Sequence, residues 1–219
     1  ELSGKTITFE RAYKLDNFIV AETAPNHLRF SPLQPLPHSL GQQKIAVLLV
    51  NFLDSPANPF TKEEARERIF NGQIQQFYRE QSYQQVVLSG EVYGWFTLPR
   101  NASVNGSCPW PTLGNNGELD QFVLNNLSIS NYDRVVVVVN HPCLTGGQST
   151  LGLVPVLLGD ATHNLSVAYV GSLNFADTPR NSANSYFSWT YFDYIFSHEL
   201  GHGLGLPHAN GLDCASTTL

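Results

Sequence analysis

Apolar and polar positions divide the chain into a weakly patterned start and a strongly patterned remainder. The first forty residues alternate weakly, at residues 6–9 and 18–20, and end in the run 31–37 (SPLQPLP), whose proline spacing favours extended polyproline conformation. The run 44–52 (KIAVLLVNF) is too apolar to face water on either side and too short for an isolated helix. It predicts a buried strand that opens the main domain.

The main domain is predicted to alternate strands and helices. Thr61 and Glu64 have the spacing of a capping box, at the start of a helix that Asn71 and Gly72 end. Helical spacing also appears at 74–81, 118–127 and in the aromatic-rich segment 186–204, whose aromatic side chains we interpret as core. Runs at 135–139, 154–158 and 166–171 indicate strands, and 85–96 a strand or hairpin. This order predicts an α/β (α+β) domain over residues 44–219, after a β segment and linker over residues 1–43.

Charge and hydropathy narrow the classes of function. The net charge is -6, with 18 acidic residues against 12 Lys and Arg and no basic cluster, which argues against nucleic acid as a partner. The longest apolar runs are strand-sized, far below the roughly 20 residues that a membrane-spanning helix needs. We expect a folded protein with no membrane span.

Cysteine spacing indicates the compartment. Cys108, Cys143 and Cys214 form no CxxC pair and are too far apart for a local metal knuckle, so a secreted protein with a disulfide bond suits them better. Cys108 and Cys143 flank a predicted helix and strand, and a bridge between them is favoured over free thiols. This leaves Cys214 unpaired. The Asn-x-Ser sequons are about as frequent as chance allows and decide nothing.

The segment 198–208 (HELGHGLGLPH) holds the candidate chemistry. Four residues of helix advance about 400°, so His198 and His202 lie on one face and both imidazoles can bind one cation. Glu199 stands beside the first ligand, where its carboxylate can accept a proton from a metal-bound water. Gly205 can end the helix in a left-handed conformation, so that the chain turns and His208 returns to the metal.

Two alternatives to this interpretation are that the motif occurs by chance and that the helix is purely structural and binds no metal. The pattern HExxHxxGxxH is expected on the order of 10⁻⁵ times by chance in a chain of this composition. In a structural helix the histidines would only bond to backbone. Gly201 and Gly203 weigh against that alternative, because each costs a helix about 1 kcal/mol relative to alanine. His27, His38, His141 and His163 stand among loop residues and are interpreted as surface or turn histidines.

The chain resembles the metzincin zinc metallopeptidases. Its segment 198–208 matches their extended zinc signature, and segments 77–83 (FYREQSY), 87–95 (VLSGEVYGW), 132–136 (YDRVV) and 208–214 (HANGLDC) resemble the immune-inhibitor-A and gametolysin-like branch in that order. The resemblance implies a mixed twisted sheet with an active-site helix, the upper subdomain of that fold. It also implies that His198, His202 and His208 bind Zn²⁺ and that Glu199 is the catalytic base.

The chain departs from the metzincin pattern at its end. Metzincins follow the third histidine with a tight turn that contains Met beneath the zinc, whereas this chain has no Met and ends at Leu219. We therefore expect a fragment whose C-terminal subdomain is missing, with the partner of Cys214 beyond its end. Residues 1–43 are either a linker or the remnant of an inhibitory propeptide, in which Asp16 would mask the zinc.

These observations lead to the expectation of a secreted zinc endopeptidase, a hydrolase that cleaves peptide bonds in protein or peptide substrates. We expect an edge strand above the metal, around residues 167–171, to align an extended substrate by β-augmentation. The alternatives are a catalytically silent zinc-containing binding or adhesion domain, and a latent zymogen fragment. Glu199 separates the first alternative from an enzyme, because a purely structural zinc site has no use for that carboxylate.

Overall fold

The N-terminal segment contains two small sheets. The computed structural model describes residues 38–102, 110–142, 146–175 and 185–208, together with four strands before residue 33. Strand β1 (Lys5–Thr8) pairs with β4 (Arg29–Pro32), and β2 (Arg11–Leu15) pairs with β3 (Phe18–Glu22), both antiparallel. These strands are the β segment expected at the start of the chain, and they belong to a unit of Glu1–Pro35 that is distinct from Leu36–Leu219.

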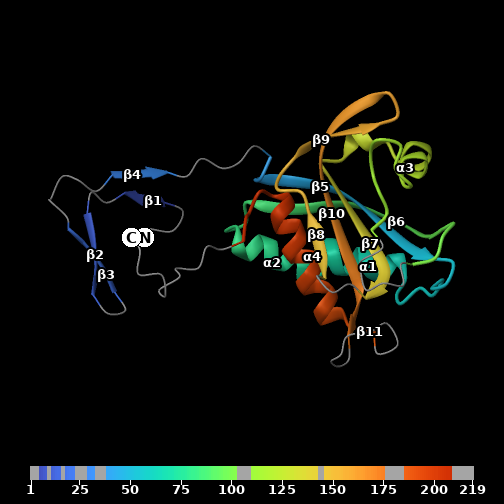
Figure 1. The fold of residues 1–219 in the computed structure, drawn as a ribbon, viewed down its shortest axis with the longest axis horizontal. Coiled ribbons are helices and arrows are strands. Elements are labelled where there is room, and N and C mark those ends of the chain that lie inside the picture. Colours follow the sequence, from blue (N-terminus) through green and yellow to red (C-terminus); the bar gives the residue numbers. More distant parts are fainter. Residues whose placement is uncertain are drawn as a thin grey trace. The chain divides into compact units, whose positions relative to one another are not determined.

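A seven-stranded sheet organises the second unit (Figure 1). Its strands are β5 (Gly41–Phe52), β6 (Val86–Leu98), β7 (Arg134–Pro142), β8 (Gly147–Ser149), β9 (Val154–Leu158), β10 (Ala161–Phe175) and β11 (Ser185–Phe187). The order is β11-β10-β7-β5-β6, and β8 and β9 also pair with β10. The four long strands are parallel, and the three short ones run antiparallel to β10. The predicted mixed α/β class is confirmed, whereas the hairpin alternative for 85–96 is wrong, because β6 is one continuous strand.

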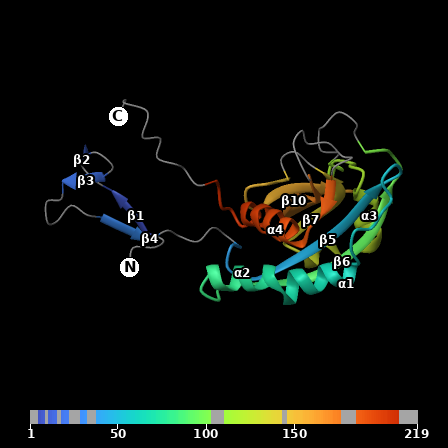
Figure 2. The ribbon, with the colours of Figure 1, turned by 90° about the horizontal axis from the view of Figure 1, so that it is seen from below.

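Helices cover both faces of this sheet. They are α1 (Lys62–Arg66), the π-helical η1 (Glu67–Asn71), α2 (Gln73–Gln81), α3 (Asp120–Asn126), the 3₁₀ turn η2 (Ile129–Asn131) and α4 (Trp189–Gly203). The predicted capping box is confirmed: Glu64 N donates to Thr61 Oγ1 at 3.1 Å, and Thr61 N donates to Glu64 Oε2 at 2.7 Å. Figure 2 shows α1 and α2 following one another along the sheet, with α4 beside β10. None of the described helices combines the length and the apolar character that crossing a membrane requires.

Alternate residues of the strands feed two separate cores. On β5, Val47 and Leu49 pack with α1, α2 and α4 on one face of the sheet, and we call this cluster the helix-side core. Leu48 and Val50 pack with helix α3 on the opposite face. The aromatic segment is largely core as predicted, since Phe192 and Phe196 are fully buried. Of the apolar side chains at helical spacing in α2, Ile74 and Tyr78 are buried, whereas Phe77 is 46% exposed.

Gly90 marks the closest approach of β6 to β5. Its φ is +149°, and a Cβ at this position would lie 1.8 Å from the Ile45 carbonyl oxygen. Gly41 also has a positive φ, of +81°, but a Cβ there would meet nothing within 4 Å. Gly90 is therefore required by the space between the strands as well as by backbone conformation.

We expect Gly90→Ala to lower the free energy of unfolding by about 3 kcal/mol or more, since the methyl group would force the two strands apart. Gly41→Ala is the matched control, with a loss of about 1–2 kcal/mol from backbone conformation alone. Urea unfolding of both variants measures the difference. Equal losses would mean that β5 and β6 do not approach so closely.

Candidate metal centre

Helix α4 ends where the histidine pattern requires it to end. Its N-cap is Ser188, whose Oγ accepts from the Tyr191 backbone N–H at 3.4 Å. At the other end Gly205 has φ +93°, and the Gly205 and Leu206 N–H groups donate to the carbonyls of His202 (2.7 Å) and Gly201 (3.0 Å). This pair of bonds is a Schellman motif. The predicted helix stop at Gly205 is confirmed.

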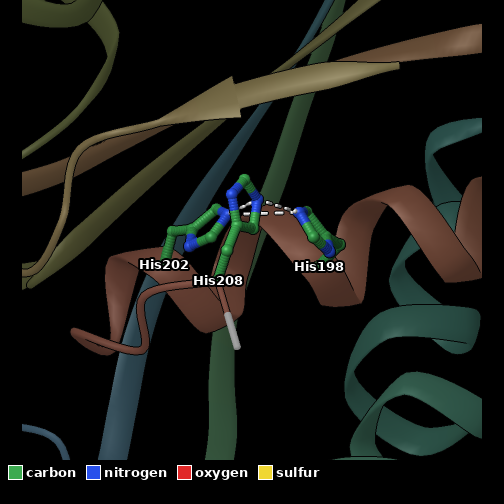
Figure 3. Close-up of side chains that lie close together, drawn as sticks. All are labelled: His198, His202 and His208. Atoms are coloured by element: carbon green, nitrogen blue, oxygen red, sulfur yellow. Dashed lines mark hydrogen bonds between the residues drawn. The ribbon is translucent and has the colours of Figure 1, made fainter. Parts of the chain in front are cut away.

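The three histidines of the motif converge on one point (Figure 3). The Nε2 atom of His198 lies 3.1 Å from those of His202 and His208, and the last two Nε2 atoms are 3.0 Å apart. His198 and His202 come from adjacent turns of α4, and His208 comes from the chain that turns back after Gly205. Three imidazole nitrogens this close cannot all satisfy one another by hydrogen bonds, because each neutral ring has only one N–H.

These residues fit a metal ion. A tetrahedral ion with metal–nitrogen bonds of 2.0–2.1 Å separates its ligand nitrogens by about 3.3 Å, close to the observed spacing. His202 Nδ1 lies 2.6 Å from the Leu206 carbonyl oxygen, so Nδ1 carries the proton and Nε2 keeps a free lone pair. Burial, together with the neighbouring His202 and His208, lowers the pKa of His198 and favours the neutral form that binds metals. The His198, His202 and His208 cluster can therefore hold a metal ion.

Glu199 points away from bulk solvent beside this cluster. Its side chain is 4% exposed, and its Oε2 atom makes no hydrogen bond with any described residue. Burial raises the pKa of Glu199 to about 7, an effect that the nearby His202 partly offsets. A carboxyl group with a pKa near neutrality can accept and release a proton at neutral pH.

Strand β8 passes directly over Glu199. A Cβ at Gly147 would lie 2.5 Å from Glu199 Cγ and 2.6 Å from the Tyr169 carbonyl oxygen, so only glycine fits between the glutamate and β10. In Figure 3, β8 is the pale yellow strand above the three rings. Our expectation of an edge strand at residues 167–171 is wrong, because this part of β10 pairs with β7 on one side and with β8 on the other. In the described part of the chain, β8 pairs with β10 alone, so β8 is the edge.

Arg134 ties the end of α4 to the sheet. Its side chain is 1% exposed and donates to Gln43 Oε1 (2.6 and 2.9 Å), Ser166 Oγ (3.3 Å), the His38 carbonyl (2.5 Å) and the Gly203 carbonyl. Burial lowers the pKa of Arg134 to about 10, which still leaves it charged at neutral pH. A cation at the C-terminus of a helix interacts favourably with the helix dipole. The role of Arg134 was not predicted from the sequence, although a charged residue at the head of the apolar run 135–139 was a usable signal.

Two further contacts hold α4 against η1 and α2. The Tyr78 hydroxyl donates to the Ser197 carbonyl at 2.6 Å, and burial raises the pKa of Tyr78, so the hydroxyl keeps its proton. Arg68 binds Asp193 in a bidentate pair, with Nε–Oδ1 at 2.8 Å and Nη2–Oδ2 at 2.5 Å. The helix that carries two of the three clustered histidines is thus fixed along its length.

The two glycines in the last turn of α4 differ in their surroundings. A Cβ at Gly203 would lie 2.7 Å from Ser166 Oγ, whereas a Cβ at Gly201 would meet Tyr78 Oη at an ordinary 3.7 Å. Gly203 therefore lets α4 pack closely on β10. No comparable steric constraint requires glycine at position 201.

Several predicted features fall outside the described residues. These are the bridge between Cys108 and Cys143, the state of Cys214, the role of Asp16, and His27. Two histidines expected in loops lie in strands instead, His141 in β7 and His163 in β10, and the His38 carbonyl binds Arg134. Within the described residues, the cluster formed by His198, His202 and His208 is the single group of metal-ligand side chains close enough to share an ion.

Comparison with models of known protein families and with curated protein sequences finds no match to this chain.

We expect Gly203→Ala to lower the free energy of unfolding by about 1–3 kcal/mol relative to Gly201→Ala, because its methyl group would push α4 away from Ser166. Gly201→Ala, with room for its methyl group, should gain up to about 1 kcal/mol from helix propensity. Thermal and urea unfolding of both variants check this. Equal stability would mean that the helix does not rest on β10 at this point.

Proposed function

We propose that the chain is a secreted zinc-dependent endopeptidase of the metzincin type, with His198, His202 and His208 as zinc ligands and Glu199 as general base. The observation that supports this most is the convergence of three Nε2 atoms within 3.1 Å beside a buried carboxylate that has no hydrogen bond at Oε2. Zinc is the proposed metal because a site of three imidazoles with an open fourth position is typical of catalytic zinc. The metzincin form of the sheet belongs to the same proposal.

The chain's own residues divide the reaction between them. A zinc ion held by the three imidazoles supplies Lewis-acid activation of a water molecule and of the scissile carbonyl group. Glu199 takes a proton from the attacking water and delivers it to the leaving amine. The Nδ1–H group of His202 bonds to the Leu206 carbonyl, which orients this ring toward the metal.

Strand β8 is the proposed guide for the substrate. It is antiparallel to β10, and a Cβ at its first residue, Gly147, would lie 2.5 Å from Glu199 Cγ, so a peptide added along its outer edge would pass near the general base. Backbone hydrogen bonds to an edge strand bind extended peptides without regard to most side chains. This assigns to β8 the role first expected for residues 167–171.

Two alternatives use the same geometry differently. A catalytically silent binding or adhesion domain would keep the metal and make no use of Glu199. A latent zymogen fragment would have the same chemistry, held back by an inhibitory propeptide within residues 1–43. The buried position of Glu199 beside the histidines favours an enzyme over a silent domain, since a buried carboxyl oxygen without a hydrogen bond costs stability, and a silent domain would have no use for it.

We expect Glu199→Gln to retain metal and fold while its peptide hydrolysis falls by at least about a hundredfold, because the amide cannot accept a proton. Hydrolysis of casein or gelatin and metal content are measured side by side on the same preparations. Glu63→Gln is the matched control, since this glutamate is exposed in the first turn of α1. Equal activity in the Glu199 variant and the unaltered protein contradicts the proposed base, and no activity in either supports the silent domain.

We expect the protein to bind one zinc ion per chain, and His208→Ala to weaken binding by more than about a hundredfold. Loss of an outer-shell partner alone costs 10–100-fold in metal affinity, and a lost ligand should cost more. The helical pair of His198 and His202 remains in this variant as a weaker site. Elemental analysis and competition with a chelator give stoichiometry and affinity, with His163→Ala as the control. If both variants bind zinc equally well, His208 is not a ligand.

A further inference from the structure

Three neighbouring strands change from apolar to polar at the same level of the sheet. On the helix-side face, each polar residue stands two positions beyond a core residue: Asn51 after Leu49, Asn140 after Val138, and Ser172 after Val170. Residues two apart on a strand share a face, so the three polar side chains point to the same side. They are 2%, 3% and 0% exposed. We call Asn51, Asn140 and Ser172 the polar row.

Every member of the polar row has an oxygen atom without a hydrogen bond. These atoms are Asn51 Oδ1, Asn140 Oδ1 and Ser172 Oγ, and all three are shielded from solvent. The orientation of each amide is set by its other end, because Asn51 Nδ2 donates to the Pro56 carbonyl at 3.0 Å and Asn140 Nδ2 donates to the Ala57 carbonyl at 2.6 Å. The two Oδ1 atoms are therefore true acceptors facing the interior, and each costs about 1–3 kcal/mol if it stays unbonded.

The strands are irregular at this level. Val139 of β7 pairs with Gly171 of β10, but the next paired residues are Pro142 and Leu173, so Asn140 and His141 together oppose the single Ser172. A bulge of this kind interrupts the ladder between two strands. No two of the three oxygens hydrogen bond to each other. One small polar group placed between them would satisfy all three.

We propose that the polar row binds one buried water molecule. Water donates two hydrogen bonds, one to each Oδ1, and accepts one from the Ser172 hydroxyl, which matches the bonding capacity of the three atoms. The row holds no carboxylate, and a cation buried among neutral groups would lack the charge that offsets its loss of hydration. The chemistry of the row thus selects a neutral ligand.

The site links the sheet to the start of the metal-binding helix. Both asparagines hold the loop after β5 through Pro56 and Ala57, and Asn51 Nδ2 also donates to Asn58 Oδ1 at 2.9 Å. This loop leads to Phe60, whose ring packs against Trp189 and Phe192 of α4 with centroids 5.0 and 5.3 Å away. A water that fixes the two amides also fixes the path of the chain to this aromatic contact.

A crystal structure of the zinc-loaded full chain at about 1.5 Å, grown with rubidium in place of sodium, tests the ligand directly. The expected result is one density peak at roughly 2.6–3.1 Å from all three oxygens, without anomalous signal at the rubidium edge. An anomalous peak would replace the water with a monovalent cation and overturn the proposal. Absence of any peak in well-defined density also overturns it.

The sign of a stability change gives a second test. Ser172→Ala should raise the unfolding equilibrium constant about fivefold, because the water loses its donor. Ser166→Ala is the matched control on the same strand, since Ser166 is equally buried and its hydroxyl accepts from Arg134. Both variants should change in the same direction. If Ser172→Ala lowers the unfolding constant instead, its hydroxyl was an unbonded group with no water, and the proposal fails.

Discussion

The hydrogen bonds of the buried Arg134 guanidinium group hold together the end of the domain that carries the histidine cluster. All of its hydrogen bonds go to neutral oxygens, from Gln43 on β5, Ser166 on β10, and the carbonyls of His38 and Gly203. The charge is stabilised by the C-terminal end of α4, whose last carbonyls have no partner within the helix. Replacing it with an apolar residue would leave several buried acceptors unsatisfied at once. The last turn of α4 is thus fixed to the sheet next to His202.

The predictable features are those that short stretches of sequence determine. The run 44–52 was recognisable as a buried strand because both of its faces are apolar, and Thr61 and Glu64 form their capping box within one turn. The histidine spacing is equally local, since helical geometry and the stop at Gly205 are enough to bring three imidazoles together. In each case the informative sequence pattern itself spans only about ten residues.

The features that sequence reasoning missed depend on partners far away in the chain. Residues 167–171 were predicted to form an edge strand, but β8 pairs with this part of β10. Strand β8 is too short to show an alternating sequence pattern of its own. Gly147 is required because Glu199 and Tyr169 approach it from other elements, and Arg134 reaches four segments at once. Phe77 lies at helical spacing from the buried Ile74, yet its side chain is 46% exposed. Only the assembled sheet determines these contacts.

The position of helix α4 against the sheet is fixed by contacts from outside the helix. The helix has two glycines in its last turn, each unfavourable to an isolated helix by about 1 kcal/mol, and a buried glutamate with an unbonded oxygen. Its position is imposed from outside, by Arg134 at one end, by the Asp193 and Ser197 contacts along its side, and by β8 above Glu199. A helix held in this way keeps His198, His202 and Glu199 in one arrangement. Such preorganisation suits the metal site and general base that we propose, because the cost of ordering these groups is met during folding.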